Sequence, residues 1–269
     1  MENFQDKVVV VTGSAGGIGL SLARQFGLDG AKVVISDLPG DRIQSAVFEL
    51  QQLGIEASGF ACDVTIREEV ESLAQHAVGA HGRVDVIVNN AGISSAPTPL
   101  IDTDLVDFKR IYDVNIYGML NGIQVFGKIF QQQGTPAGIY NLGSENSIYP
   151  CVPSAHAYVS SKHAVLAITE LLAEETPDFI EVALIMPGFV NSEMTRGPFD
   201  GMDTDAFASK VIQQLKAGEF YIVSHAYNKV RLNERYSVIA AAYDKYAPRY
   251  PGDDEFDVRT LISQLRRKA

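Results

Sequence analysis

The segment KVVVVTGSAGGIG, residues 7–19, contains the pattern that decides the fold. Its β-branched run predicts a buried strand, and the residues from 17 onward have the apolar spacing of a helix. Glycines at 13, 17 and 19 permit a tight turn between the two elements and a close approach of a ligand to the backbone. A helix that begins directly after such a turn offers free N–H groups to a phosphate. The segment therefore predicts a phosphate-binding turn, although a glycine-rich turn by itself often only ends a strand.

Outside this segment, short β-branched runs alternate with longer amphipathic segments along most of the chain. Such alternation is typical of parallel strands joined by crossover helices. We therefore predict an α/β fold, a single Rossmann-type doubly wound parallel sheet with helices on both faces, formed by residues 1–269 as one domain. Strands are predicted at 7–12, 31–37, 56–62, 84–92, 137–144, 180–188 and 219–225, and helices at 17–29, 41–54, 66–80, 103–133, 156–176 and 229–246.

Two segments depart from this alternation. Residues 189–206 are rich in glycine and follow a predicted strand, so they should project from the carboxyl edge of the sheet, where open α/β sheets bind ligands. This placement favours a substrate loop over an insertion that the fold merely tolerates. Residues 226–269 have helical patterns and predict a helical C-terminal extension.

Composition limits the classes of partner. A net charge of -11 disfavours nucleic acid and anionic membranes, because both require basic surfaces. Two cysteines give no disulfide framework, so we expect reduced thiols in a reducing compartment. Without a signal peptide or an apolar stretch of roughly 18 residues, the sequence predicts a cytoplasmic protein with a small-molecule substrate. No metal site is predicted.

The predicted second strand ends at Asp37. A carboxylate there can accept hydrogen bonds from both hydroxyls of an adenosine ribose, and it would repel a 2′-phosphate. Because no Arg or Lys lies within the glycine-rich segment or directly after Asp37, the sequence favours NAD over NADP. A carboxylate that only caps the following turn is the alternative. Asp63, Asn90 and Gly92, at the ends of the next two strands, would lie near the adenine and the adenosine.

The segment AHAYVSSKHAV, residues 155–165, places Tyr158 four positions before Lys162. In a helix these side chains lie on one face, one turn apart. The pair alone is compatible with an ordinary helix surface, or with a phenol whose proton is lost more easily beside an ammonium group.

Six motifs occur in one order and at consistent spacing: TGSAGGIG at 12–19, NNAG at 89–92, Asn115 in DVNIYG, Ser144, YVSSK at 158–162 and PGFVNS at 187–192. Over about residues 5–195 the chain resembles the classical short-chain dehydrogenases/reductases. The resemblance implies a nicotinamide cofactor and hydride transfer between a carbinol carbon and the nicotinamide ring. It also implies a homodimer or homotetramer, although the helical extension puts the usual tetramer contact in doubt.

The resemblance also implies a role for each motif residue. Tyr158 would be the acid/base, with its pKa lowered by Lys162 and the oxidised nicotinamide. Ser144 would orient the substrate oxygen, with Ser147 as a less favoured alternative, and Asn115 would hold a water that links Lys162 to solvent. The predicted catalytic set is Asn115, Ser144, Tyr158 and Lys162. The predicted cofactor set is Gly13, Ser14, Gly17, Ile18, Gly19, Asp37, Asp63, Val64, Asn90, Gly92, Tyr158, Lys162, Pro187, Gly188, Val190 and Ser192.

The expected substrate contacts are Ser144, Glu145, Asn146, Phe189 and Met194. Glu145 is equally well explained as a solvated loop charge. The neighbouring stretches are mostly apolar or small, which predicts a hydrophobic secondary alcohol or ketone, cyclic or aromatic. The leading hypothesis is an NAD-dependent alcohol dehydrogenase. The alternatives are an NADPH-dependent carbonyl reductase, which Asp37 disfavours, and a non-catalytic nucleotide-binding regulatory protein, which the retained Tyr, Lys and Ser disfavour.

Overall fold

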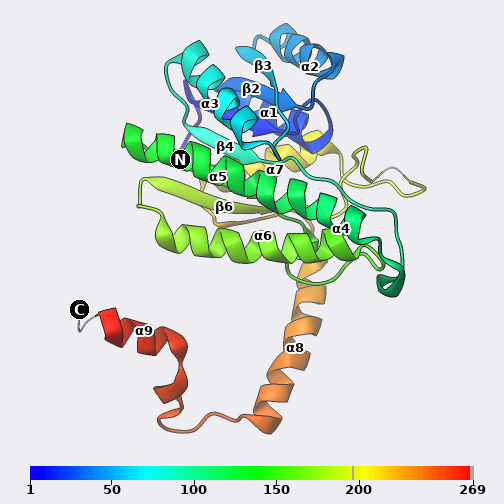
Figure 1. The fold of residues 1–269 in the computed structure, drawn as a ribbon, viewed down its shortest axis with the longest axis vertical. Coiled ribbons are helices and arrows are strands. Elements are labelled where there is room, and N and C mark those ends of the chain that lie inside the picture. The colour runs from blue at the N-terminus through cyan, green and yellow to red at the C-terminus, as the bar shows by residue number, and fades with distance from the viewer. Residues whose placement is uncertain (196, 267–269) are drawn as a thin grey trace. The chain divides into compact units, whose positions relative to one another are not determined.

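All seven predicted strands occur in the computed structural model of the protein, which describes residues 1–195 and 197–266. They form one parallel sheet in the order β3-β2-β1-β4-β5-β6-β7 (Figure 1), so the chain reverses its direction of winding between β1 and β4. The strands are β1 (Val8–Thr12), β2 (Lys32–Asp37), β3 (Ala57–Ala61), β4 (Val86–Asn89), β5 (Ala137–Leu142), β6 (Ile180–Met186) and β7 (Tyr221–Val223). The predicted Rossmann-type sheet is confirmed.

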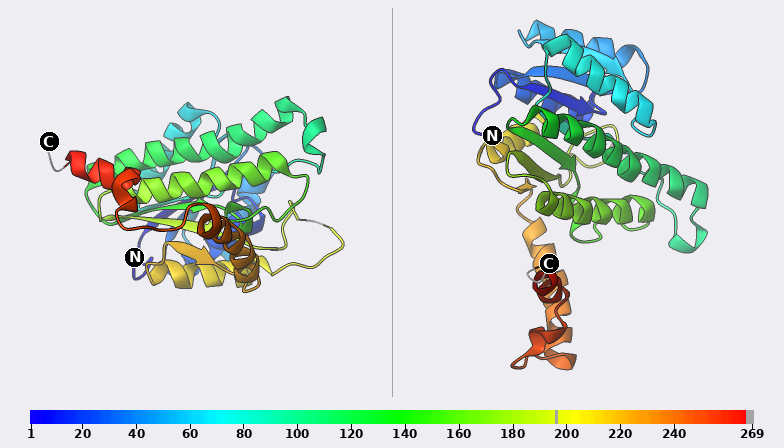
Figure 2. Two further views of the ribbon diagram at one scale, coloured as in Figure 1. Left: turned by 90° about the horizontal axis from the view of Figure 1, so that it is seen from below. Right: turned by 60° about the vertical axis from the view of Figure 1, so that its left-hand side comes forward.

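Alternate side chains of β1 pack into two different hydrophobic cores. Val9 and Val11 belong to a core with α1 (Gly17–Leu28), α2 (Asp41–Gln52) and α7 (Thr204–Lys216). Val8 and Val10 belong to a second core with α3 (Arg67–His81), α5 (Met119–Gln133) and α6 (His156–Glu175). Helices therefore cover both faces of the sheet, and α5 and α6 lie side by side on one of them (Figures 1 and 2).

The predicted helix at 103–133 runs without a gap from Leu105 to Gln133, but it is not α-helical throughout. It consists of α4 (Leu105–Tyr112), a π-helical turn (Asp113–Gly118) and α5. Single π-helical turns inside longer helices often occur at functional sites. Asn115, which we expected in the middle of an α-helix, lies in this turn.

The sequence analysis missed α7 and consequently drew the substrate loop too long. The Asp203 side chain caps α7, because its Oδ1 accepts hydrogen bonds from Asp205 N at 3.0 Å and Ala206 N at 2.9 Å. The loop therefore ends at Asp203 rather than at residue 206. Within it, Val190 and Met202 pair as an isolated bridge.

The chain divides into two compact units, Met1–Ala226 and Tyr227–Ala269. The second unit contains α8 (Asn228–Tyr246), a 3-10 turn (Asp253–Phe256) and α9 (Val258–Arg266). Arg196 in the substrate loop and residues 267–269 of the predicted extension lie outside the described residues. Among the helices that the structure describes, none combines the length and the hydrophobicity that crossing a membrane requires.

Candidate active site

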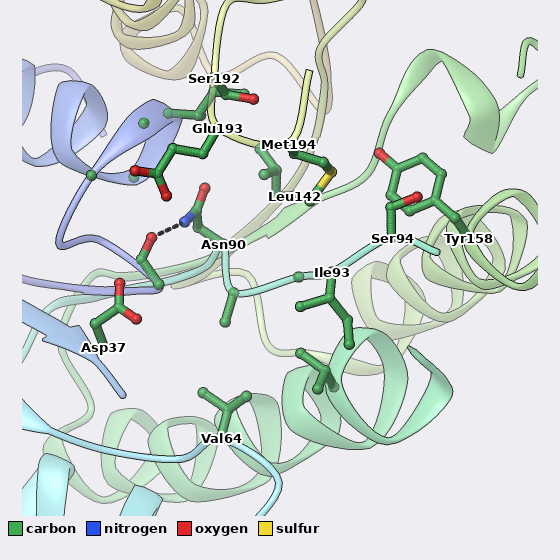
Figure 3. A pocket seen from close by; sticks show the side chains of 18 of the residues that line it. Asp37, Val64, Asn90, Ile93, Ser94, Leu142, Tyr158, Ser192, Glu193 and Met194 are labelled. Atoms are coloured by element: carbon green, nitrogen blue, oxygen red, sulfur yellow. Dashed lines mark hydrogen bonds between the residues drawn. The ribbon is translucent and has the colours of Figure 1, made fainter. Parts of the chain in front are cut away.

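A cavity of about 970 Å³ opens at the carboxyl ends of the strands, at the point where the winding reverses. This is where open α/β sheets bind their ligands. Figure 3 shows Asp37 at one end of the cavity and Tyr158 and Ser94 at the other. The lining includes every residue of the predicted cofactor set except Ser14, namely Gly13, Gly17, Ile18, Gly19, Asp37, Asp63, Val64, Asn90, Gly92, Tyr158, Lys162, Pro187, Gly188, Val190 and Ser192.

The glycine-rich turn is closely packed. Gly13 has a φ of +61°, and a Cβ added there would lie 2.8 Å from Ala91 Cα. A Cβ at Gly19 would lie 2.5 Å from Gly13 O. Asn90 Nδ2 holds the turn against β4 by donating to Thr12 O and Gly13 O, both at 2.8 Å. Figure 3 draws one hydrogen bond from Asn90. Only glycine fits these positions, because a side chain at either would collide with the chain's own atoms.

The start of α1 is left open to an anion. Gly16 precedes the helix without a side-chain cap, and the first turn carries no acidic residue. The first N–H groups of a helix have no partner within the helix. Together with the partial positive charge of the helix terminus, these groups make this end of α1 chemically suited to an anion.

Ser14, which we predicted to contact the cofactor, does not line the cavity. Its side chain is buried, Oγ donates to Val11 O at 2.6 Å, and Oγ also accepts from Ser36 N at 3.0 Å. These bonds direct the hydroxyl between β1 and β2 instead of into the cavity. The Ser14 side chain therefore fixes the turn.

Asp37 and a residue that the sequence analysis missed, Arg42, form the end of the cavity beside the glycine-rich turn. Asp37 accepts hydrogen bonds from Ala15 N and Leu38 N, both at 2.9 Å. A Cβ at Gly16 would lie 2.5 Å from Arg42 Nη2, so the guanidinium lies next to the turn. Arg42 Nη1 donates at 3.1 Å to Glu193 Oε2 in the substrate loop, and both side chains are more than half exposed.

Ser144, Tyr158 and Lys162 converge at the other end. Ser144 begins the 3-10 turn after β5, where its Oγ accepts from Asn146 N at 3.1 Å. Lys162 is buried, lies 5.7 Å from the centre of the Tyr158 ring and donates to Leu142 O at 2.6 Å. Burial lowers the pKa of Lys162 to about 8. Because α6 carries both Tyr158 and Lys162, the one-turn spacing brings them to the same face.

The protein's own groups raise the pKa of Tyr158. Burial of the phenol is the largest cause, hydrogen bonding to Ser144 opposes it, and the charge of Glu145 raises the pKa further. The sequence analysis expected Lys162 and the oxidised nicotinamide to lower this pKa. In the structure the Lys162 ammonium is bonded to the Leu142 carbonyl, and desolvation of the phenol outweighs the favourable contacts.

Asn115 is buried and does not line the cavity. Its Oδ1 accepts from Ile93 N at 2.8 Å, and its Nδ2 donates to Ile93 O and Ser161 Oγ, both at 3.0 Å. A Cβ at Gly92 would lie 3.3 Å from Asn115 Oδ1 and 3.7 Å from Lys162 Nζ, so the two side chains flank the same glycine. Asn115 thus joins the chain after β4 to α6, and its place in a proton relay stays a prediction.

Only two of the five expected substrate contacts line the cavity, Ser144 and Met194. Asn146 is buried and its Oδ1 accepts from Cys151 N at 2.8 Å and Val152 N at 3.2 Å, so it shapes the loop rather than the cavity wall. Glu145 accepts from Tyr149 Oη at 3.3 Å and Cys151 Sγ at 3.0 Å. Phe189, like Glu145 and Asn146, is absent from the lining.

The cavity wall also contains polar residues that the sequence analysis did not name. Arg110 and Asp113 precede or begin the π-helical turn, and Thr195 belongs to the substrate loop. Thr195 Oγ1 donates to Val190 O at 2.6 Å and accepts from Ser192 N at 2.8 Å, which orders the turn after β6. Within residues 1–195 and 197–266, no group of three or more His, Cys, Asp or Glu is arranged to hold a metal ion.

Comparisons with known proteins agree with this geometry. The family model described as short chain dehydrogenase matches residues 7–202. The 1-deoxy-11-beta-hydroxypentalenate dehydrogenase of Streptomyces exfoliatus is 31% identical over 87% of this chain and 88% of its own length. The mitochondrial borneol dehydrogenase of Lavandula x intermedia is 34% identical over 73% of this chain and 74% of its own.

A solved structure agrees as well. The crystal structure of a short chain dehydrogenase/reductase from Burkholderia phymatum in complex with NAD superposes with a TM-score of 0.84 and 25% identity, covering 93% of this chain and 99% of that one. With the sheet order, the glycine-rich turn and the convergence of Ser144, Tyr158 and Lys162 already established, the chain belongs to the short-chain dehydrogenase/reductase family.

Proposed function

We propose that the protein is an NAD-dependent oxidoreductase that interconverts a secondary alcohol and its ketone. The observation that carries this proposal is that Ser144, Tyr158 and Lys162 lie at one end of a cavity whose other end holds Asp37 and the glycine-rich turn. In this proposal, one elongated ligand spans the cavity from the glycine-rich turn to Tyr158. The NAD complex of the Burkholderia phymatum relative supports a nicotinamide cofactor.

The residues at the Asp37 end fit a dinucleotide. The uncapped start of α1 suits a pyrophosphate, and the packed glycines line the cavity beside it. The Asp37 carboxylate suits the two hydroxyls of an adenosine ribose. Pro187, Gly188, Val190 and Ser192 would hold the carboxamide end, with Lys162 beside the nicotinamide ribose. When bound, the nicotinamide ring supplies the acceptor or donor of the hydride.

The reaction requires a base for the alcohol proton. As the C–H bond breaks and its hydride leaves, the O–H bond breaks and its proton passes to the Tyr158 oxygen, so that a C=O bond forms. Ser144 orients the alcohol oxygen toward Tyr158. Lys162, whose Nζ lies 5.7 Å from the centre of the Tyr158 ring, would supply a positive charge that offsets part of the cost of the phenolate once the site is occupied. In the reductive direction Tyr158 returns the proton.

The side chains near Tyr158 support an apolar substrate. Ile93, Val114, Leu142 and Met194 line the cavity together with the small residue Ser94. Apolar walls with a few placed polar groups are typical of sites for small apolar ligands. The relatives that are named for hydroxypentalenate and borneol support an alcohol of this kind. We infer a hydrophobic cyclic or aromatic secondary alcohol.

One observation favours the NADPH-dependent alternative. Arg42 lies beside Asp37 and next to Gly16, so a guanidinium is available at the place where a 2′-phosphate would lie. However, Arg42 is paired with Glu193, and Asp37 itself contacts the turn by accepting a hydrogen bond from Ala15 N. The pairing of Arg42 with a carboxylate supports NAD as the preferred cofactor.

The test is reduction of NAD and NADP, in parallel, with a panel of aliphatic, cyclic, aromatic and steroid secondary alcohols, borneol included. We expect activity with NAD on a cyclic or aromatic alcohol. Tyr158→Phe should lower kcat by about 10²- to 10⁴-fold, which is the usual contribution of a general base. NADH binding, followed by its fluorescence, should stay unchanged. Unaltered turnover in this variant would remove Tyr158 from the role, and silence of the wild type across the panel with intact NADH binding would favour a non-catalytic protein.

A further inference from the structure

The segment that follows β6 lies between the ends of the two neighbouring strands, β5 and β7. Its residues Pro187 and Gly188 line the cavity. On the β5 side, Pro187 O accepts a hydrogen bond from Glu145 N at 2.8 Å, which ties the segment to the turn that begins with Ser144. On the β7 side, the contact comes from a side chain, that of His225. The segment is therefore held from two directions.

The register of the strands brings His225 to this place. β6 and β7 are parallel neighbours in which Met186 pairs with Val223. Gly188 and His225 each follow these residues by two positions, so that continuing the register places them opposite each other. The contact is direct, because a Cβ added at Gly188 would lie 2.5 Å from Cγ and 2.6 Å from Nδ1 of the imidazole. The ring fills the space that a side chain at position 188 would need, and it does not itself line the cavity.

The imidazole of His225 also binds the next carbonyl group. Its Nε2 lies 3.1 Å from Phe189 O. Because a carbonyl oxygen can only accept, Nε2 carries a proton and donates it to this bond. Ser224 Oγ lies 2.8 Å from Nδ1, so in the neutral ring the hydroxyl donates to Nδ1 and selects this tautomer. Ser224 thereby keeps His225 in the form that binds Phe189 O.

The same carbonyl oxygen joins the two ends of the substrate loop. Phe189 O accepts a second hydrogen bond, from Met202 N at 2.8 Å, and Asn191 N donates to Met202 O at 2.8 Å. A Cβ at Gly201 would lie 2.7 Å from Phe189 O, so the returning chain is closely packed there. One side chain from the end of β7 thus contacts both the cavity wall at Gly188 and the base of the loop.

We propose that His225 is a positioning residue for the nicotinamide end of the cofactor. The inference rests on the proposed function, in which residues 187–192 hold the carboxamide. His225 would fix this backbone through its contacts with Gly188 and Phe189, without touching the reacting atoms. Small displacements of a reacting group from its productive position are costly. A shift of residues 187–189 should therefore weaken the nicotinamide contacts and leave the adenosine contacts near Asp37 as they are.

The experiment compares two ligands by isothermal titration calorimetry of the full chain. They are NADH and ADP-ribose, which has the adenosine, both phosphates and the second ribose but lacks the nicotinamide. The wild type should bind NADH more tightly than ADP-ribose. In His225→Asn the amide is too short to reach Phe189 O. This variant should raise the Kd of NADH about three- to tenfold, the effect of losing one hydrogen bond, and leave the Kd of ADP-ribose unchanged.

Two further variants make the comparison specific. His225→Gln places an N–H group where Nε2 lies in histidine, so it should restore most of the affinity for NADH. The matched control is His76→Ala, because His76 on α3 also makes a side-chain contact, with Ser58 Oγ at 3.4 Å, but does not line the cavity. It should change neither Kd. The emission of bound NADH, which reports the surroundings of the nicotinamide, should differ from that of the wild type in His225→Asn and not in His225→Gln.

Three results would overturn the proposal. They are a wild-type affinity for NADH in His225→Asn, an equal loss of NADH and ADP-ribose binding in that variant, and a loss of NADH affinity that His225→Gln does not restore. The last two would assign His225 a structural role only. Equal affinity of the wild type for NADH and ADP-ribose has a different meaning, because it would refute the nicotinamide site of the proposed function itself, and this inference with it.

Discussion

Replacing Gly19 by alanine tests the close packing of the glycine-rich turn. The added Cβ would lie 2.5 Å from Gly13 O, 2.5 Å from Asn90 Nδ2 and 2.8 Å from Ser14 Cα. Two of these neighbours are backbone atoms, so relief requires the turn itself to move. Overpacking of this kind costs about 1–3 kcal/mol, whereas alanine in a helix gains about 0.5–1 kcal/mol over glycine. We therefore expect the free energy of unfolding to fall by up to about 2.5 kcal/mol, and each kcal/mol lowers Tm by about 2–4 °C in a chain of this size.

The movement of the turn should also weaken cofactor binding. If one charge-assisted hydrogen bond from the turn to a phosphate is lost, at about 1.5–3 kcal/mol, the Kd of NADH rises at least about tenfold. Thermal unfolding and fluorescence titration with NADH measure the two effects. Gly79→Ala is the matched control, because Gly79 also lies in a helix but has nothing within 4 Å of an added Cβ. It should raise Tm slightly and leave the Kd unchanged. A Gly19→Ala protein with the Tm and Kd of the wild type would refute the argument that the turn requires glycine.

Three further predictions concern the two ends of the cavity. Asp37→Ala should narrow the preference for NAD over NADP, measured as the ratio of kcat/KM values, and an unchanged ratio would show that the ribose is bound elsewhere. Glu193→Ala removes the partner of Arg42; an exposed ion pair is worth about 0.2–1 kcal/mol, so kcat/KM for NADP should rise by up to about fivefold with little change for NAD, and a fall for NADP would contradict this. Glu145→Gln removes a charge that raises the pKa of Tyr158. Because the base is active when deprotonated, a lower pKa moves the rising limb of the kcat/KM profile for alcohol oxidation to lower pH, and a limb that stays in place or moves upward would exclude this influence.

The sheet was predictable because its strands have a strong local signal. Runs such as VVVV at 8–11 are buried on both faces, and burial of every residue leaves an uninterrupted apolar pattern. The helix α7 was missed although Phe207, Val211 and Leu215 have helical spacing. The predicted glycine-rich loop was extended past Asp203, into the first turn of this helix. The π-helical turn around Asn115 has no comparable local signal, because it depends on contacts with Ile93 and Ser161 from distant parts of the chain.

The residues of the candidate site also differ in how far the sequence predicts them. The residues that line the cavity through their backbone or at strand ends, such as Gly13 and Asp37, follow from the order of strand, turn and helix. The direction in which a side chain points does not follow from this order. Ser14 turns inward to β2, and Asn146 turns back on its own loop, because each finds unpaired backbone groups there. Arg42 reaches the cavity from the first turn of α2. The sequence alone does not show that this turn lies beside the cavity.

The ion pair between Arg42 and Glu193 joins the nucleotide end of the cavity to the substrate loop. A phosphate that engages Arg42 has to compete with Glu193 for the guanidinium, and the loop then loses a contact that holds it to α2. Two equilibria, the binding of a nucleotide and the position of the loop, thereby share one side chain. The coupling is reciprocal. If binding of the phosphate weakens the contact between the loop and α2 by a given free energy, that contact weakens binding of the phosphate by the same free energy. If the proposed roles hold, the choice of cofactor and the position of residues 189–203 would be thermodynamically linked through this ion pair.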